Sequence, residues 1–151
     1  FPSYETVLSL ARNHVLIKSE LTGQADQDRK KISSALRRGQ FYVSFDLLEN
    51  PQGFSSYIRD ASGTLHPLGS ELKYLSGQEY IVHLPAKPLV PFEVAIFKDG
   101  KKMMSSDSQD SAYALQGPGV YRSVVRVRVP MPAPDGKTWI NWILTNPIYV
   151  K

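Results

Sequence analysis

The feature that most restricts the fold is a series of short alternating segments separated by turn sequences, which begins after Gly39. Residues 41–46 alternate between apolar and more polar side chains, and this period of two is typical of a strand with one buried face. Similar segments follow within roughly 110 residues, each bounded by turn residues. Short strands with frequent turns favour two antiparallel sheets packed together, so residues 41–151 are predicted to form a β-sandwich domain.

The boundaries of these strands are marked by Gly, Pro, Asn and Asp. We expect strands within residues 41–46, 54–59, 64–68, 80–84, 92–98, 101–105, 113–116, 120–129 and 139–149. Asp99-Gly100 is the strongest hairpin signal in the chain. Residues 105–111 are predicted to be a polar loop. Pro147 cannot donate a hydrogen bond to a neighbouring strand, so Asn146-Pro147 predicts a break in the last strand region.

The first 40 residues have a different pattern, which is typical of helices. Apolar residues recur every three or four positions between Ser3 and Val15, and this spacing predicts an amphipathic helix that ends near His14. The residues that form its apolar stripe are Tyr4, Val7, Leu8, Ala11 and Val15.

A second helix is predicted from about residue 24 to residue 38. Asp26 and Asp28 lie near its start, two arginines lie at its end, and Gly39 suits the position that terminates a helix. Its apolar stripe consists of Ile32, Ala35 and Leu36. We expect residues 1–40 to form a helical segment that packs on the sandwich.

The longest predicted strand, residues 120–129, has two different faces. One face is expected to point inward and contains Tyr121, Ser123, Val125, Val127 and Val129. The opposite face contains Arg122, Arg126 and Arg128 and is expected to meet water, as in a sheet with one solvated side. Arginines on such a face discourage edge-to-edge pairing of sheets, and the alternative is that they bind an anionic ligand.

Tyr121 opens this strand directly after the tight turn Gly117-Pro118-Gly119. Its hydroxyl can donate back to the upstream backbone, as in the tyrosine corner of immunoglobulin-like sandwiches, or it can remain a core aromatic with a solvated hydroxyl. Ser123 stands where an antibody domain has its second cysteine, so a disulfide is not part of the expected similarity. The predicted fold is mainly β: an immunoglobulin-like antiparallel β-sandwich preceded by two α-helices.

Composition excludes several functional classes. The chain contains no cysteine, which excludes disulfides, thiolate zinc sites and cysteine nucleophiles. Its 18 basic and 14 acidic residues give a net charge of +4, without the dense basic footprint of a nucleic-acid-binding protein. We therefore expect no nucleic-acid binding. No apolar run approaches the roughly 18 residues that cross a bilayer, so we also expect no membrane span.

Residues with catalytic or metal-binding chemistry do not form a recognisable motif. His14, His66 and His83 are scattered, without a His-x-His or His-Glu-x-x-His pattern, so no metal ligand and no cofactor is predicted. Asp46 is the best-placed acid because it closes the first predicted strand, and we interpret it as a turn-capping residue. The chain alone is therefore predicted not to be an enzyme. The alternative is an acid pair assembled by the fold around Asp46.

Two tryptophans lie three positions apart in the last strand region, and in a regular strand they would point to opposite faces. At least one could be exposed as a stacking platform for a sugar or a protein, while the alternative is packing against the N-terminal helices. The candidate binding residues are Arg122, Arg126, Arg128, Trp139 and Trp142.

Two further stretches have distinctive patterns. Residues 28–46 contain Ala35-Leu36-Arg37-Arg38-Gly39 followed by an alternating strand. The chain later contains residues 117–122, a turn leading into a strand, and it ends in Asn146-Pro147-Ile148-Tyr149-Val150 before the last lysine. Together these stretches resemble the C-terminal region of one group of PHP-family (polymerase and histidinol phosphatase) metal-dependent phosphoesterases. In that family a late helix and strand leave the catalytic barrel and lead into a C-terminal sandwich.

This resemblance implies a role beside a catalytic domain. The family binds two or three metals through His-x-His pairs and further barrel residues, and none of these motifs is present here, so no metal ligand is carried over. The chain begins at Phe1 without an initiator Met or a signal-peptide pattern, so we expect it to be part of a longer protein.

Our leading hypothesis is a non-catalytic C-terminal accessory module. It would support or orient a phosphoesterase domain or recruit the substrate of that domain, with an upstream catalytic domain or another protein as its partner. The alternative is an immunoglobulin-like module that recognises carbohydrate or protein.

Overall fold

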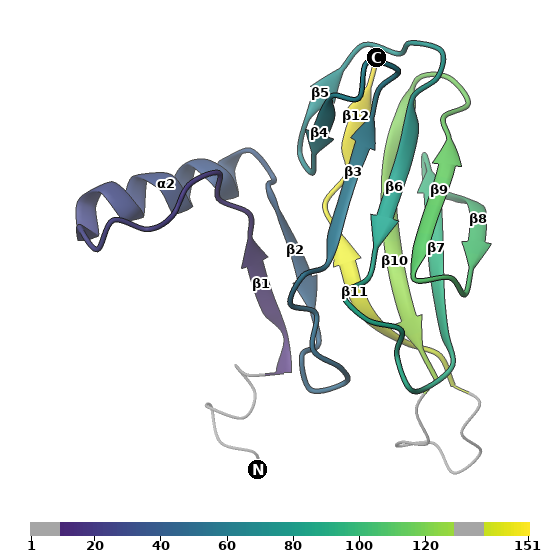
Figure 1. Cartoon of the computed structure of the whole chain (residues 1–151), viewed down its shortest axis with the longest axis horizontal. Helices are drawn as coiled ribbons and strands as arrows, with labels where there is room; N and C mark the ends of the chain where they lie inside the picture. Colours follow the sequence, from purple (N-terminus) through teal and green to yellow (C-terminus); the bar gives the residue numbers. More distant parts are fainter. Residues whose placement is uncertain (1–9, 129–137) are drawn as a thin grey trace.

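The structure is a computed structural model that describes residues 10–128 and 138–151. It is mainly β, with two sheets that share one core and a single helix in the described residues, instead of the two predicted (Figure 1). The larger sheet contains β1 (Arg12–Val15), β2 (Phe41–Ser44), β5 (Glu71–Leu72), β7 (Phe92–Lys98), β8 (Lys101–Ser106), β10 (Gly119–Val127), β11 (Ile140–Thr145) and β12 (Ile148–Val150). The smaller sheet contains β3 (Ser55–Arg59), β4 (Leu65–Pro67), β6 (Glu79–His83) and β9 (Asp110–Ala114). The helix is α2 (Ala25–Arg37).

Strand β10 organises the larger sheet, whose order is β1-β2-β11-β10-β12-β5. One edge of β10 pairs with β7, and the other pairs in turn with β12 and β11. These pairs are antiparallel, whereas β12 and β5 pair in parallel. The smaller sheet has the order β4-β3-β6-β9 and is antiparallel.

Each of the nine segments predicted as strands contains or overlaps a strand. The hairpin prediction is also confirmed, because Asp99 and Gly100 both have positive φ values, of 49° and 81°, as a two-residue type I′ turn requires. The chain breaks as expected at Asn146-Pro147, between β11 and β12. The predicted loop at 105–111 is shorter than expected, because β9 begins at Asp110, which pairs with His83 of β6.

The core lies between the two sheets, and its largest fully buried side chains are Trp142, Tyr80 and Tyr121. The predicted inward face of β10 is confirmed for its described residues: Tyr121, Ser123, Val125 and Val127 are fully buried, and Val129 lies outside the described residues. This placement follows from the period of two of a strand, which puts every second side chain on the same face.

The Tyr121 hydroxyl bonds to the upstream backbone, which is the first of the two alternatives for this residue. Its hydroxyl donates to the carbonyl oxygen of Gly117, four residues upstream, at 2.7 Å. The hydroxyl is therefore bonded to the backbone and is not a solvated tip on a core aromatic.

The predicted N-terminal helix is wrong over residues 12–15, which form β1. Strand β1 pairs antiparallel with β2, with His14 opposite Tyr42 and Val15 opposite Phe41. Residues 3–9 of that prediction lie outside the described residues. Because a neighbouring strand provides hydrogen-bond partners for the backbone, ladder formation outweighs a helical spacing of apolar residues.

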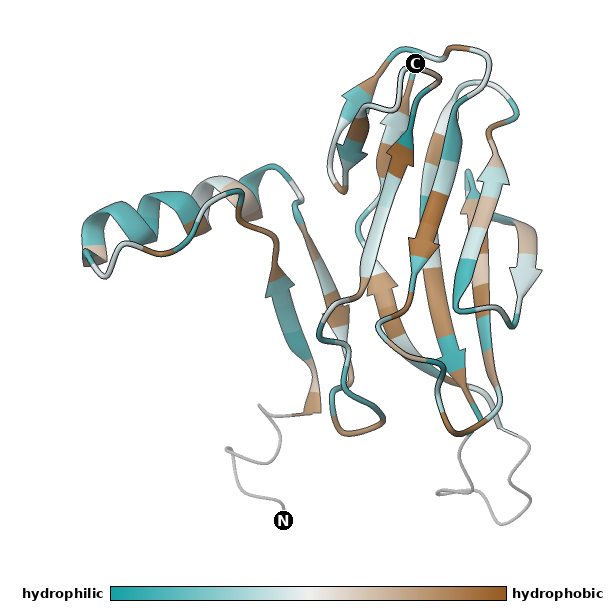
Figure 2. Cartoon of the chain, in the orientation of Figure 1, coloured by the Kyte–Doolittle hydropathy of each residue, from teal (hydrophilic) through white to brown (hydrophobic). Residues whose placement is uncertain are grey.

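The helix predicted near residues 24–38 is confirmed as α2, and Gly39 directly after it has a φ of +69°. Figure 1 shows α2 extending away from the sandwich, to which β1 and β2 connect it. Figure 2 shows hydrophobic residues concentrated on the strands, whereas α2 is mostly hydrophilic. No helix in the described residues is both long and apolar enough to span a membrane.

Candidate functional site

Three of the five predicted binding residues come together at one end of β10. The guanidinium carbons of Arg126 and Arg128 lie 5.8 and 5.7 Å from the ring centre of Trp139, which directly precedes β11. Cations at this distance are attracted to the electron-rich face of an indole. Trp139 nevertheless remains 38% exposed. We call these three residues the Arg–Trp surface.

A carboxylate on the neighbouring strand holds this surface in place. Glu93 of β7 lies opposite Arg126, whose Nε donates to Glu93 Oε2 at 2.9 Å. Lys102 Nζ, at 3.0 Å, and the Ser105 hydroxyl donate to the other carboxylate oxygen. Burial by itself would raise the pKa of Glu93, but the hydrogen bonds from Ser105, Arg126 and Lys102 outweigh it and lower the pKa to about 2. The carboxylate is therefore ionised at neutral pH and fixes the position of Arg126.

Two shallow hollows of about 470 Å³ each meet at Trp139. The first is lined by Phe92, Glu93, Ser105, Ser106, Asp107, Arg126 and Trp139. The second is lined by Lys87, Pro88, Leu89, Val90, Pro91, Phe92, Asp107 and Trp139. Because Phe92, Asp107 and Trp139 line both hollows, the indole lies at the boundary between them.

The other two predicted binding residues lie elsewhere. The Arg122 guanidinium packs over the Phe97 ring, 4.8 Å from its centre. Trp142 is fully buried in the core, and its indole N–H donates to the carbonyl oxygen of Glu49 at 2.9 Å. Trp142 is thus a core residue, so neither the stacking role nor packing against the N-terminal helices applies to it.

The three histidines each pair with an aspartate, which their isolation in the sequence did not indicate. The pairs are His14–Asp46, His66–Asp60 and His83–Asp110, with N–O distances of 3.0, 3.1 and 2.5 Å. Hairpin geometry brings the second pair together, whereas the other two depend on which strands become neighbours. No group of three or more His, Cys, Asp or Glu side chains in residues 10–128 and 138–151 is placed to hold a metal ion.

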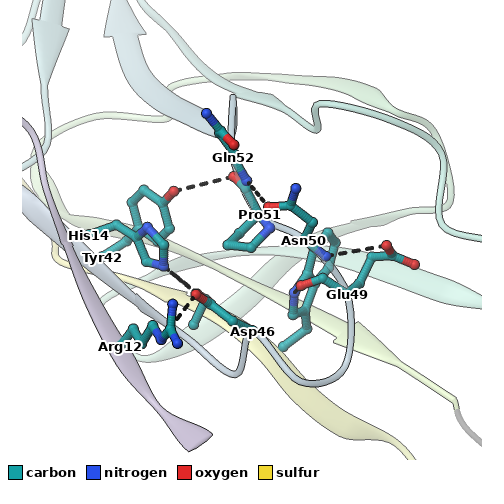
Figure 3. A network of polar contacts seen from close by, with 10 residues as sticks. Arg12, His14, Tyr42, Asp46, Glu49, Asn50, Pro51 and Gln52 are labelled. Carbon is teal, nitrogen blue, oxygen red and sulfur yellow. Dashed lines mark hydrogen bonds and ion pairs between the residues drawn. The ribbon is translucent and has the colours of Figure 1, made fainter. Parts of the chain in front are cut away.

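The His14–Asp46 pair belongs to a larger polar network (Figure 3). His14 Nε2 lies 2.9 Å from Ser44 Oγ and 3.0 Å from Asp46 Oδ1, and the Ser44 hydroxyl also donates to Asp46. Arg12 Nε lies 3.7 Å from the second oxygen of Asp46. Asp46, predicted to cap a turn, instead accepts hydrogen bonds that tie the edge strand β1 to β2. Ser44 is fully buried and so cannot serve as an accessible nucleophile.

Tyr42 packs against the His14 ring of this network. Its ring stacks on that of His14, with centres 4.7 Å apart and planes only 4° from parallel. Its hydroxyl donates to the carbonyl oxygen of Pro51 at 3.3 Å. Burial, together with the negative charge of Asp46, raises the pKa of Tyr42 to about 12, so the hydroxyl keeps its proton.

The stretches at 28–46 and 146–150 meet where α2 joins the sandwich. Asn146 Nδ2 donates to the Gly39 carbonyl at 3.2 Å, and the Gly69 N–H donates to the Pro147 carbonyl at 3.0 Å. A Cβ atom on Gly69 would lie 1.8 Å from the Arg38 carbonyl oxygen, so only glycine fits this approach. We call these residues, Arg38, Gly39, Gly69, Asn146 and Pro147, the helix junction.

The chemistry that these sites provide is stacking, ion pairing and hydrogen bonding at the Arg–Trp surface, and close backbone packing at the helix junction. Both places combine residues that are far apart in the sequence. In comparisons with known proteins, no family model, no curated protein and no solved structure matches this chain.

Proposed function

We propose that this chain is a non-catalytic accessory module that orients a catalytic domain of the PHP phosphoesterase type, which its sequence resembles. The observation that carries the proposal is a partly exposed apolar stripe on a helix that is closely packed against the sandwich at its end. An immunoglobulin-like topology is part of this proposal, and the bond from Tyr121 to Gly117 supports it.

The apolar stripe of α2 is only partly covered. Ala35 is buried, whereas Ile32 and Leu36 remain 36% and 40% exposed, and Leu21, just before the helix, is 54% exposed. An amphipathic helix is stabilised when its apolar face packs against another surface. The exposed part of the stripe therefore suits contact with a neighbouring domain.

The helix junction would give this contact a defined direction. The close approach of Gly69 to Arg38 leaves little room for the end of α2 to shift, and the Asn146 bond to Gly39 ties it to the end of β11. A module that orients another domain needs such a stiff connection, because a flexible one would allow many orientations.

The first test concerns catalysis. The purified 151-residue chain is incubated with bis(p-nitrophenyl) phosphate, with and without Mn²⁺, and its metal content is measured by mass spectrometry. We expect no release of p-nitrophenol above the buffer rate. Robust metal-dependent turnover by the pure protein would overturn the proposal.

The second test concerns attachment. A PHP-type catalytic barrel that lacks its own C-terminal region is titrated with this chain by calorimetry. Ile32→Asp and Leu36→Asp should each weaken binding at least about tenfold, because a charge is placed in an apolar contact. The matched control is Leu65→Asp on β4, which changes a leucine that is 55% exposed and distant in sequence from α2. Absent binding of the wild-type chain, or an equal loss in the control, would contradict the proposal.

A further inference from the structure

We propose that the Arg–Trp surface binds a neutral, extended oligosaccharide that crosses the ring of Trp139. This inference does not rest on the proposed attachment through α2, because the residues involved lie on β7, β8, β10 and the segments beside them. It assigns a ligand class to a surface that has no role in the proposed orientation of a catalytic domain.

Trp139 presents an exposed ring in a fixed position. Its ring keeps 38% of its surface exposed, while Arg126 and Arg128 pack against it. Arg126 is held in turn by Glu93, so the indole has a defined position before any ligand arrives. A preorganised aromatic ring binds the apolar face of a sugar at a lower entropic cost than a mobile one.

Two neighbouring hollows share the ring of Trp139. The hollow towards β8 offers the polar side chains of Ser105, Ser106 and Asp107. The hollow towards the loop before β7 is mainly apolar and contains Pro88 and Leu89, the latter 99% exposed. Because Trp139 lines both hollows, a ligand that occupies both also contacts its ring, which favours a chain of several sugars over a single ring.

Positive and negative side chains lie next to each other at the Arg–Trp surface. Glu93 pairs with Arg126, and the carboxylate of Asp107 lines both hollows, so the positive charge of the arginines is opposed locally. An acidic group placed directly beside Glu93 or Asp107 would be repelled, whereas the hydroxyls of a neutral sugar would not. Guanidinium and carboxylate groups also provide paired donors and acceptors, which match the neighbouring hydroxyls of a sugar.

The experiment begins with an array of neutral and acidic oligosaccharides probed with the whole chain. For each sugar that the array retains, the affinities of its disaccharide and its tetrasaccharide are then measured by calorimetry. Soluble tetrasaccharides of β-1,4-linked glucose, xylose and mannose are measured in the same way. We expect a neutral tetrasaccharide to bind at least about fivefold more tightly than its disaccharide, since it reaches both hollows. Tryptophan fluorescence should change on binding, because Trp139 is exposed while Trp142 is buried.

Trp139→Ala should weaken binding at least about tenfold and remove the fluorescence change, with the unfolding temperature nearly unchanged. The matched control is Tyr149→Ala, which removes an aromatic ring that is 41% exposed on β12 of the same sheet and lines neither hollow. This control should bind like the wild type.

Three results would overturn the inference: no sugar retained above the level of Trp139→Ala, equal losses in both variants, or preferential binding of an acidic polysaccharide or a proline-rich peptide. None of these three results would change the binding of a catalytic barrel through Ile32 and Leu36. The inference and the proposed function can therefore fail separately.

Discussion

At the scale of single residues, Glu93 has the clearest electrostatic role in the molecule. It accepts hydrogen bonds from an arginine, a lysine and a serine, and its side chain is only 13% exposed. These bonds stabilise the ionised carboxylate by more than burial destabilises it, which is why its pKa falls to about 2.

This lowered pKa predicts a pH-dependent stability that Glu93→Gln removes. A carboxyl group whose pKa is lower in the folded chain stabilises the fold above its unfolded pKa of about 4.3, and that contribution is lost as the pH falls towards 2. The variant should be less stable than the wild type by about 1–2 kcal/mol at pH 7, allowing for partly exposed partners. Urea unfolding between pH 7 and pH 2.5 measures the difference. A difference that stays constant over this range would show that ionisation of Glu93 is not the cause.

Single residues also differ in how well the sequence predicted them. Tyr121 follows a tight glycine-proline turn, and this local pattern indicated its bond to the backbone as one of two alternatives. Asp46 could not be predicted in the same way, because its partner His14 comes from a strand 32 residues earlier. A local rule such as turn capping cannot account for a partner that only strand pairing brings near.

At the scale of elements, the connection between α2 and the sandwich depends on Gly69. The residue has a φ of +78°, and its Cα faces the backbone at the end of the helix. Two separate demands therefore favour glycine here, a left-handed backbone and the absence of a side chain.

These demands can be separated by comparing Gly69→Ala with Gly63→Ala. Gly63 has a similar φ of +86°, but a Cβ atom there would meet nothing within 4 Å. Gly63→Ala should cost about 1 kcal/mol of stability from backbone strain alone. Gly69→Ala should cost about 3 kcal/mol or more and increase amide exchange in β1 and β2, because the Arg38 carbonyl must move. Equal losses in urea unfolding would mean that the helix junction is not tightly packed.

The N-terminal strand shows where element prediction reaches its limit. Residues 12–15 have the spacing of a helix, yet they form β1 because β2 has an unpaired edge beside them. Strand β5 was also not predicted, since it is two residues long and exists only as a partner of β12. In both cases the deciding hydrogen bonds come from residues distant in the sequence.

At the scale of the whole molecule, a buried polar cluster connects the two sheets. Tyr80 of the smaller sheet accepts a hydrogen bond from Ser56 at 2.9 Å, and its hydroxyl lies 3.4 Å from both Ser123 and Thr145 of the larger sheet. Burial raises the pKa of Tyr80, so the hydroxyl remains protonated and able to donate. Tyr80 itself belongs to the hydrophobic core that the two sheets share.

Tyr80→Phe should therefore destabilise the whole fold by about 1–3 kcal/mol, because several buried polar groups lose a partner. Tyr149→Phe is the matched control, since that tyrosine is 41% exposed, and it should change stability by less than about 0.5 kcal/mol. Chemical unfolding monitored by tryptophan fluorescence measures both variants. Unchanged stability of Tyr80→Phe would indicate that the cluster does not connect the sheets energetically.

The amino-acid sequence by itself determined the local properties of this protein: the strand segments, the hairpin at Asp99-Gly100, the helix at residues 25–37 and the inward face of β10. These follow from side-chain periodicity and turn chemistry, which act between near neighbours. Only the tertiary structure decided that Trp139 joins Arg126 and Arg128 while Trp142 is buried, and that Gly69 meets the end of α2. The physical reason is that these contacts depend on the order and register of strands, which arise from packing of the whole chain.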